Sequence, residues 1–287
     1  MARNRIARGR STGWWGALLL CGMALALIAG EIAARLAGVG DFPLYIADEE
    51  VGYLPAPGQQ GAFLGRNRWV FNEHSMGVGQ AYAPQPDDIL LVGDSLVLGG
   101  NMVDQPDKLG PRLEEATGCN VWPLAAGSWA LRNELAALRR DPSFQIPRTT
   151  VLVLNDGDFS APSRWQSELT HPRERPGSVL AYAIRKRFFM PDEAASPPSE
   201  DPRWRKELEL FVRSYPGRVI VLAHPTRDQL GSEGSPIPAL PDGITVIDPR
   251  MSGVWDAADY ADSIHPTPAA NAELAAILAT DLPHCTK

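Results

Sequence analysis

The chain has few cysteines and histidines, which excludes several kinds of site. Its 287 residues include three cysteines and five histidines, and no group of them has the spacing of zinc ligands. We therefore expect no metal site, and no motif indicates a cofactor. With 44% hydrophobic and 21% charged residues, the composition excludes disorder and fibrous repeats as the main description. A chain of this length buries enough apolar surface to fold without metal or disulfide staples.

Outside the N-terminus, acidic residues outnumber basic ones. The net charge of the whole chain is −7. Residues 1–38 contain five arginines and one glutamate, a net of +4, so the remaining residues carry −11. A body this acidic repels phosphate backbones, so we expect no nucleic-acid partner. The same charge disfavours strongly anionic substrates.

One long apolar run lies near the N-terminus. Residues 14–30 (WWGALLLCGMALALIAG) contain no charge and follow four arginines in the first ten residues. At about 1.5 Å per residue, the run spans most of a hydrocarbon core of roughly 30 Å. The arginines predict a cytoplasmic N-terminus, which places the rest of the chain in a periplasmic or extracellular compartment. A cleavable signal peptide, with Ala24-Leu25-Ala26 as its cleavage site, is the alternative to an uncleaved anchor.

The pattern divides the chain into four parts. We expect a basic cytoplasmic segment at 1–13, a transmembrane signal anchor at 14–38, an extended connector with short strands at 39–87, and the main domain at 88–287. Within the main domain, the proline-rich residues 160–202 predict an irregular insertion, either a cap near the site or a plain surface loop.

Short apolar strands alternate with helices along the main domain. The strands are continuous apolar runs, the pattern expected when both faces of a parallel sheet are covered. This predicts an α/β fold, a three-layer α/β/α sandwich with a central parallel sheet and the added N-terminal transmembrane helix. Strands are expected at Asp88–Val92, Asn120–Leu124, Thr150–Leu154, Arg218–Ala223 and Ile244–Ile247, and helices at Lys108–Thr117, Ala130–Arg140, Arg203–Ser214 and Pro268–Thr280.

A serine follows the first core strand in a tight turn. Gly93-Asp94-Ser95 comes directly after the strand, where an α/β enzyme can expose a nucleophile and aim backbone N–H groups at an oxyanion. The tripeptide alone is a weak signal, because a turn with Asp94 or Ser95 capping the next helix has the same sequence.

A histidine and an aspartate stand just before the last helix. Serine needs a base to accept its proton, and histidine is the usual base near neutral pH. Asp262, three residues before His265, can reach the imidazole and fix its tautomer. The other four histidines, namely His74, His171, His224 and His284, are expected to be surface or core residues.

Together these blocks resemble the SGNH/GDSL hydrolases. GDSL at residues 93–96 after a first core strand, and DxxHP before the last helix, match that family in the right order over roughly residues 88–281. The resemblance implies Ser95 as the nucleophile, His265 as the base and Asp262 as its orienting partner, in a serine esterase, lipase or carbohydrate deacetylase.

The family's other two blocks imply an oxyanion hole built from a glycine N–H and an asparagine side chain. Gly127 matches the glycine block. The asparagine block departs from the family's Gly-x-Asn-Asp, because the chain reads Asn155-Asp156-Gly157-Asp158. Alignment on the adjacent Asn-Asp makes Asn155 the donor. Alignment on strand length puts Gly157 in that position, so the donor is lost or is supplied by Asn155 or Asn133.

The predicted function is serine-dependent hydrolysis of an acyl ester, with an acetylated cell-envelope polysaccharide as the candidate substrate. A polysaccharide O-acetyltransferase with the same triad, and a non-catalytic envelope scaffold, are the alternatives. Trp122 and Trp129 flank the glycine block and are assigned either to the core or to a sugar-binding face. Cys119 and Cys285 would pair in an oxidising compartment, or remain separate thiols.

Overall fold

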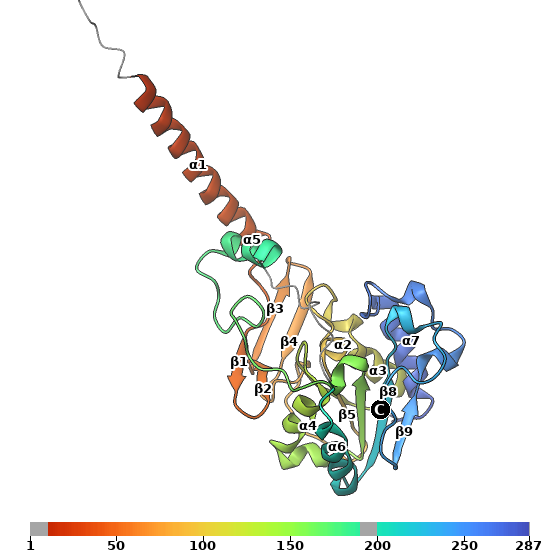
Figure 1. Ribbon diagram of the computed structural model, residues 1–287. Helices are drawn as coiled ribbons and strands as arrows, with labels where there is room; N and C mark the ends of the chain where they lie inside the picture. Colours follow the sequence, from red (N-terminus) through yellow and green to blue (C-terminus); the bar gives the residue numbers. More distant parts are fainter. Residues whose placement is uncertain (1–10, 190–199, 287) are drawn as a thin grey trace, which may run out of the picture.

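A long helix projects from an α/β body in the computed structural model, which describes residues 11–189 and 200–286 (Figure 1). The first ten residues of the predicted basic segment and residues 190–199 of the predicted insertion lie outside the described residues. Helix α1 spans Ser11–Leu36. An 18-residue window within Trp14–Leu36 has a mean hydropathy of 2.2 and none of it is buried, so the helix is long and apolar enough to cross a membrane.

Five parallel strands form the central sheet, in the order β6-β5-β7-β8-β9. This confirms the parallel sheet that the continuous apolar runs of the sequence predict. Ile89 of β5 pairs with Val121 on one side and Thr149 on the other, so β5 lies inside the sheet. The strands are β5 (Ile89–Gly93), β6 (Val121–Ala125), β7 (Thr149–Leu154), β8 (Arg218–Ala223) and β9 (Ile244–Ile247).

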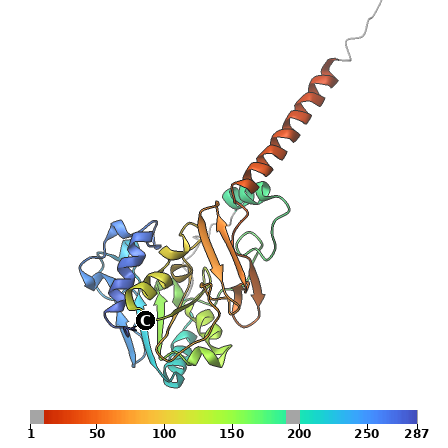
Figure 2. The ribbon, with the colours of Figure 1, turned by 180° about the vertical axis from the view of Figure 1, so that it is seen from behind.

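Helices cover both faces of this sheet, which confirms the three-layer arrangement (Figures 1 and 2). Alternate side chains of β5 enter opposite cores, Leu90 and Val92 on one face and Ile89 and Leu91 on the other. The first core also contains α4 (Leu131–Arg139) and α6 (Arg203–Ser214), and the second contains α3 (Leu109–Thr117) and α7 (Pro268–Ala279). Short 3₁₀ helices occur at Gln105–Asp107, Pro142–Gln145, Asp156–Phe159, Arg227–Gln229, Pro249–Ser252 and Ala257–Asp259.

Two antiparallel hairpins precede the central sheet. Strands β1 (Tyr45–Asp48) and β2 (Gly52–Pro55) form one, and β3 (Gln59–Phe63) and β4 (Asn67–Phe71) form the other. The first hairpin packs against the body through buried side chains, including Tyr53 and Leu54. The backbone carbonyl of Tyr53 accepts a hydrogen bond from the Trp129 indole at 2.9 Å.

The tryptophans beside the glycine block belong to the core. Trp122 and Trp129 are each 2% exposed. The Trp122 indole donates to the carboxylate of Asp88 at 2.9 Å, so both indole N–H groups have partners inside the protein. Of the two roles assigned from sequence, the structure therefore supports the core and leaves no sugar-binding face at these residues.

The proline-rich insertion contains a helix that the sequence pattern does not reveal. Helix α5 spans Val179–Phe189 and lies at the body-proximal end of α1 (Figure 1). The Glu31 carboxylate accepts hydrogen bonds from the Ser178 hydroxyl and from the N–H groups of Val179 and Leu180, at 2.8–3.0 Å. These bonds satisfy N–H groups at the start of α5 that have no partner inside the helix. This helical part of the insertion therefore packs on α1 and does not cap the candidate site.

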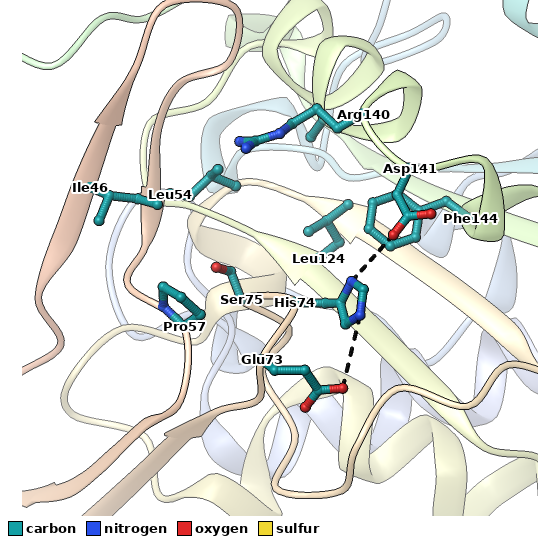
Figure 3. A pocket seen from close by; sticks show the side chains of 11 residues that line it. Ile46, Leu54, Pro57, Glu73, His74, Ser75, Leu124, Arg140, Asp141 and Phe144 are labelled. Carbon is teal, nitrogen blue, oxygen red and sulfur yellow. Dashed lines mark ion pairs between the residues drawn. The ribbon is translucent and has the colours of Figure 1, made fainter.

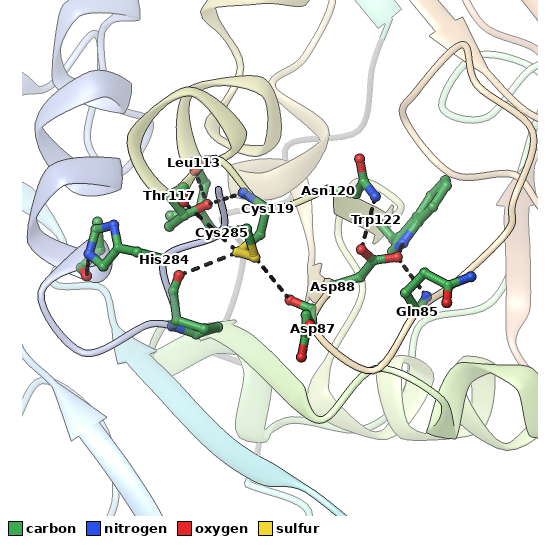
Figure 4. Close-up of a disulfide and its surroundings, with 12 residues drawn as sticks. Gln85, Asp87, Asp88, Leu113, Thr117, Cys119, Asn120, Trp122, His284 and Cys285 are labelled. Atoms are coloured by element: carbon green, nitrogen blue, oxygen red, sulfur yellow. Dashed lines mark hydrogen bonds between the residues drawn. A yellow bond between two sulfur atoms is a disulfide. The ribbon is translucent and has the colours of Figure 1, made fainter. Parts of the chain in front are cut away.

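A disulfide joins the two cysteines of the main domain. Cys119 lies just before β6 and Cys285 lies beyond α7, with their Cα atoms 4.9 Å apart (Figure 4). The C-terminal tail is thereby held against the start of β6. Of the two possibilities left open by the sequence, the structure has the bonded pair. Cys21 is a free thiol on the exposed surface of α1.

Candidate active site

The Gly-Asp-Ser turn lies at the carboxyl end of a central strand. Strand β5 ends at Gly93, and the short helix α2 (Ser95–Leu98) begins two residues later. Asp94 caps α2, because its carboxylate accepts the Leu96 N–H at 2.8 Å. A Cβ at Gly93 would lie 2.6 Å from a methyl group of Val97, so a larger residue there would push α2 away from the sheet. Glycine therefore fixes the position of Ser95.

The three predicted catalytic residues form one chain of hydrogen bonds. The Ser95 hydroxyl lies 2.9 Å from Nε2 of His265, although 170 residues separate them. Nδ1 of the same ring lies 2.8 Å from Oδ2 of Asp262. This arrangement sets the proton of the neutral ring on Nδ1, where it donates to the carboxylate, and leaves Nε2 free to accept the serine proton.

Asp262 is held in its charged form. Partial burial opposes ionisation, but the N–H groups of His265 and Ile264, and the imidazole, outweigh it and lower the pKa of the Asp262 carboxyl. Its Oδ1 accepts those two N–H groups at 2.8 and 2.9 Å, while Oδ2 faces the ring. One carboxylate thus orders both the backbone and the imidazole of the loop.

A second histidine supports the loop from inside, a role that the sequence did not suggest. His224 directly follows β8 and is fully buried. Burial lowers its pKa to about 4, so the ring is neutral, and its Nε2–H donates to the carbonyl of Ile264 at 2.8 Å. That carbonyl immediately precedes His265. Only its position in the sequence could have indicated this role, because a residue that directly follows β8 lies at the same edge of the parallel sheet as Ser95.

Asn155 directly follows β7 and contacts the Gly-Asp-Ser turn through Asp94. Its side-chain nitrogen is 2.8 Å from Oδ2 of Asp158 and 3.3 Å from Oδ2 of Asp94, the neighbour of Ser95. Its side-chain oxygen accepts the Gly157 N–H at 2.8 Å. The amide therefore contacts the residue before Ser95, with one short bond to Asp158 and one long bond to Asp94.

Asn155 contacts two of three buried carboxyl groups that lie near one another, namely Asp94, Asp158 and Glu134. Burial raises the pKa of Asp94 to about 6. Burial, together with the proximity of Asp94, raises the pKa of Asp158 and of Glu134 well above their usual range. Both carboxyl oxygens of Glu134 lack a hydrogen-bond partner among the described residues. The raised pKa values of these three groups could not be predicted from sequence, because burial by tertiary packing creates them.

The structure distinguishes the other two candidate oxyanion residues. Gly127 follows β6, and its carbonyl accepts the Tyr53 hydroxyl at 2.7 Å, so hairpin β1–β2 anchors this loop. Asn133 is 1% exposed, and its amide bonds the backbones of Val51, Ser163 and Ala130. Its hydrogen-bonding groups are occupied by backbone partners, so Asn133 has a structural role.

A cavity of about 310 Å³ opens beside the nucleophile. Ser95 and His265 line it together with apolar side chains, among them Leu96, Met102 and Val103. The cavity can therefore hold a small, mainly uncharged group against the serine hydroxyl.

Another cavity, of about 270 Å³, surrounds His74 (Figure 3). His74 contacts Asp141 at 3.4 Å and Glu73 at 3.9 Å. This histidine faces two acidic side chains. None of the predicted catalytic residues lines this cavity, because Ser95, His265 and Asp262 all line the other one.

Comparisons with known proteins find similarity in structure only. No family model matches the chain, and no curated protein matches it. Among solved structures it is similar to a lipase/acylhydrolase from Enterococcus faecalis, with 14% identity and a TM-score of 0.42, over 70% of this chain and 100% of that one. A member of the lipolytic protein G-D-S-L family from Veillonella parvula DSM 2008 has 14% identity and a TM-score of 0.35, over 68% and 96%. A variant of an acetyl-xylooligosaccharide esterase from Geobacillus Stearmophilus has 12% identity and a TM-score of 0.40, over 69% and 94%.

Proposed function

We propose that this chain is a serine-dependent hydrolase of acyl esters, of the SGNH/GDSL type. The observation that carries the proposal is the continuous hydrogen-bonded chain from Asp262 through His265 to Ser95, opening onto a cavity of about 310 Å³. A nucleophile, a base in the required tautomer and an ionised orienting acid are the groups that acyl transfer needs.

In the proposed mechanism, the Ser95 oxygen attacks the ester carbonyl carbon while Nε2 of His265 takes the hydroxyl proton. Asp262 stabilises the resulting imidazolium through the Nδ1–H bond. Collapse of the tetrahedral intermediate passes the proton from Nε2 to the departing alcohol and leaves an acyl-serine. Water, deprotonated by the same nitrogen, attacks the acyl-serine and releases the acid and the free serine.

Three donors are proposed for the oxyanion, namely the N–H groups of Ser95 and Gly127 and the side-chain amide of Asn155. The Asn155 amide has two hydrogens. We assign the one on the 2.8 Å bond to Asp158 to holding the side chain, and the one on the 3.3 Å contact with Asp94 to the oxyanion. A substrate oxyanion has only to displace the longer and weaker of the two bonds.

The proposed substrate is a small acyl ester, preferably acetyl, on a cell-envelope carbohydrate. The apolar wall of the cavity favours a neutral acyl group, and the net charge of −11 on residues 39–287 disfavours strongly anionic substrates. We further propose that α1 anchors the chain, with the main domain outside the cytoplasm. The Cys119–Cys285 bond supports this location, because disulfides persist in oxidising compartments.

Hydrolysis is tested with a panel of acetylated sugars and longer acyl esters, using the purified full chain. We expect turnover that falls as the acyl chain lengthens and that Ser95→Ala abolishes. Ser263→Ala is the matched control, because Ser263 is an exposed serine in the same loop as the base and is expected to leave turnover unchanged. Full turnover by Ser95→Ala would refute the proposal. Acceleration by an added glycan that gains acetyl groups would identify an O-acetyltransferase instead.

A further inference from the structure

Helix α5 presents apolar and basic side chains together on its surface. Ile184, Phe188 and Phe189 are 45%, 72% and 70% exposed. Ile184 and Phe188, four residues apart, lie on the same face of the helix, and Phe189 adjoins Phe188 around it. Residues 185–187 between them read Arg-Lys-Arg. Adjacent exposed aromatic residues are unusual on a surface that meets only water, and they mark an interaction site.

The position of α5 is fixed by α1. Besides the Glu31 bonds to its first turn, the Arg35 guanidinium donates to the carbonyl of Gly177 at 2.7 Å. The two helices also touch closely, because a Cβ at Gly30 would lie 3.1 Å from a methyl group of Leu180. The start of α5 is therefore held at the level of Glu31.

That level corresponds to the edge of a membrane if α1 spans one. The charge-free run of residues 14–30 is about 25 Å long and ends at Glu31, and the candidate span ends at Leu36. A second helix fixed at this depth lies in the layer where lipid headgroups meet acyl chains. Figures 1 and 2 both show α5 at the end of α1, between that helix and the body.

We propose that α5 is an interfacial helix that binds an anionic lipid surface. Ile184, Phe188 and Phe189 enter the boundary between headgroups and acyl chains, and the exposed Arg185 and Arg187 pair with lipid phosphates. The two arginines carry the charge opposite to that of lipid phosphates, whereas the net charge of −11 on the rest of the body is repelled by an anionic surface. This inference rests on the membrane anchoring proposed above and is independent of ester hydrolysis. Two attachments, α1 and α5, then fix the orientation of the domain on the bilayer.

The test places a nitroxide label on α5 in the full chain, reconstituted in phosphatidylcholine nanodiscs with and without phosphatidylglycerol. Phe188→Cys carries the label in a Cys21→Ser background, since the other two cysteines are bonded to each other. Met251→Cys is the matched control, because Met251 is 77% exposed on the body. We expect the label at 188 to collide preferentially with oxygen, several-fold more than the label at 251, most strongly with phosphatidylglycerol. Changing Arg185 and Arg187 to Gln should remove the dependence on that lipid.

Each other outcome overturns the proposal. Equal, water-like accessibility at both positions, with the chain still resistant to carbonate extraction, refutes lipid binding by α5 and leaves the anchor intact. Carbonate extraction of the chain refutes the anchor and the α5 proposal together. Spin–spin broadening between labels at 188 would show that a second copy of the chain occupies this face. Ester hydrolysis, measured on the same nanodiscs, reports separately on the proposed function.

Discussion

The two groups of polar residues that meet at Ser95 differ in exposure and in the use of their hydrogen bonds. The outer group consists of Asp262 and His265, which lie on a loop with side chains 55% and 41% exposed. The bond from Asp262 orients the imidazole of His265, which in turn bonds the Ser95 hydroxyl. The inner group comprises Asn155, Asp94 and Asp158 together with Glu134, and it is buried. In the inner group, the carboxyl groups of Asp94 and Asp158 bind the Asn155 amide that is the proposed oxyanion donor. In the proposed mechanism, the outer group transfers the proton with its bonds intact, whereas the inner group gives up one bond to hold the oxyanion.

The largest effect is expected from the outer group. His265→Ala removes the acceptor for the serine proton, so kcat for ester hydrolysis should fall on the order of 10⁴-fold, with little change in KM. Steady-state kinetics checks this loss. His284→Ala, which changes a histidine far from the cavity, should retain wild-type kcat. A comparable loss in both variants would contradict the special role of the outer group.

The inner group should contribute less to the rate. Asn155→Ala removes the proposed third oxyanion donor but leaves two backbone N–H groups, so kcat should fall by about 100-fold. Kinetics with a minimal acetyl ester gives the measurement. An unchanged kcat would mean that Asn155 stays bonded to its carboxylates throughout the reaction. The oxyanion hole would then consist of backbone donors alone.

The support of the outer loop by His224 gives a smaller expected effect. His224→Phe removes the bond to the Ile264 carbonyl, and the resulting misplacement of His265 should lower kcat about tenfold. KM should stay unchanged, because His224 does not line the cavity. His224→Gln can still donate to the carbonyl and should restore much of kcat. If Gln and Phe reduce kcat equally, the hydrogen bond is not what positions the base.

The smallest effect concerns stability and belongs to the inner group. The raised pKa values of Glu134 and Asp94 mean that the folded chain retains protons that the unfolded chain has already released. The free energy of unfolding should therefore fall as the pH rises above about 4, and Asp94 should add to this fall up to about pH 6. Glu134→Gln removes the contribution of Glu134 to this fall. Between pH 4 and pH 8, the free energy of unfolding of the variant should therefore fall by on the order of 1 kcal/mol less than that of the wild type.

Urea unfolding at several pH values measures this difference, with Glu233→Gln as the control at an exposed glutamate. The control should follow the wild-type pH dependence. A Glu134→Gln variant that also follows it would show that Glu134 does not retain its proton in the folded chain.

Most of the body could be predicted from the sequence, because each central strand is a short apolar run bounded by turn residues. The pairing of Ser95 with His265 was also predictable, from the GDSL block after a core strand and the DxxHP block before the last helix. Helix α5 was not, because Glu31 of a distant helix satisfies its first N–H groups. The buried carboxyl group of Glu134 was likewise hidden, because on α4 it reads as an ordinary surface residue.

Labelling with a fluorophosphonate probe tests the central claim most directly, because the probe reacts only with a serine whose proton is taken by a base. The account predicts one probe per chain, located on Ser95 by peptide mass spectrometry, and no labelling of His265→Ala. Absence of label from the folded wild-type chain, or equal labelling of the His265→Ala variant, would contradict it.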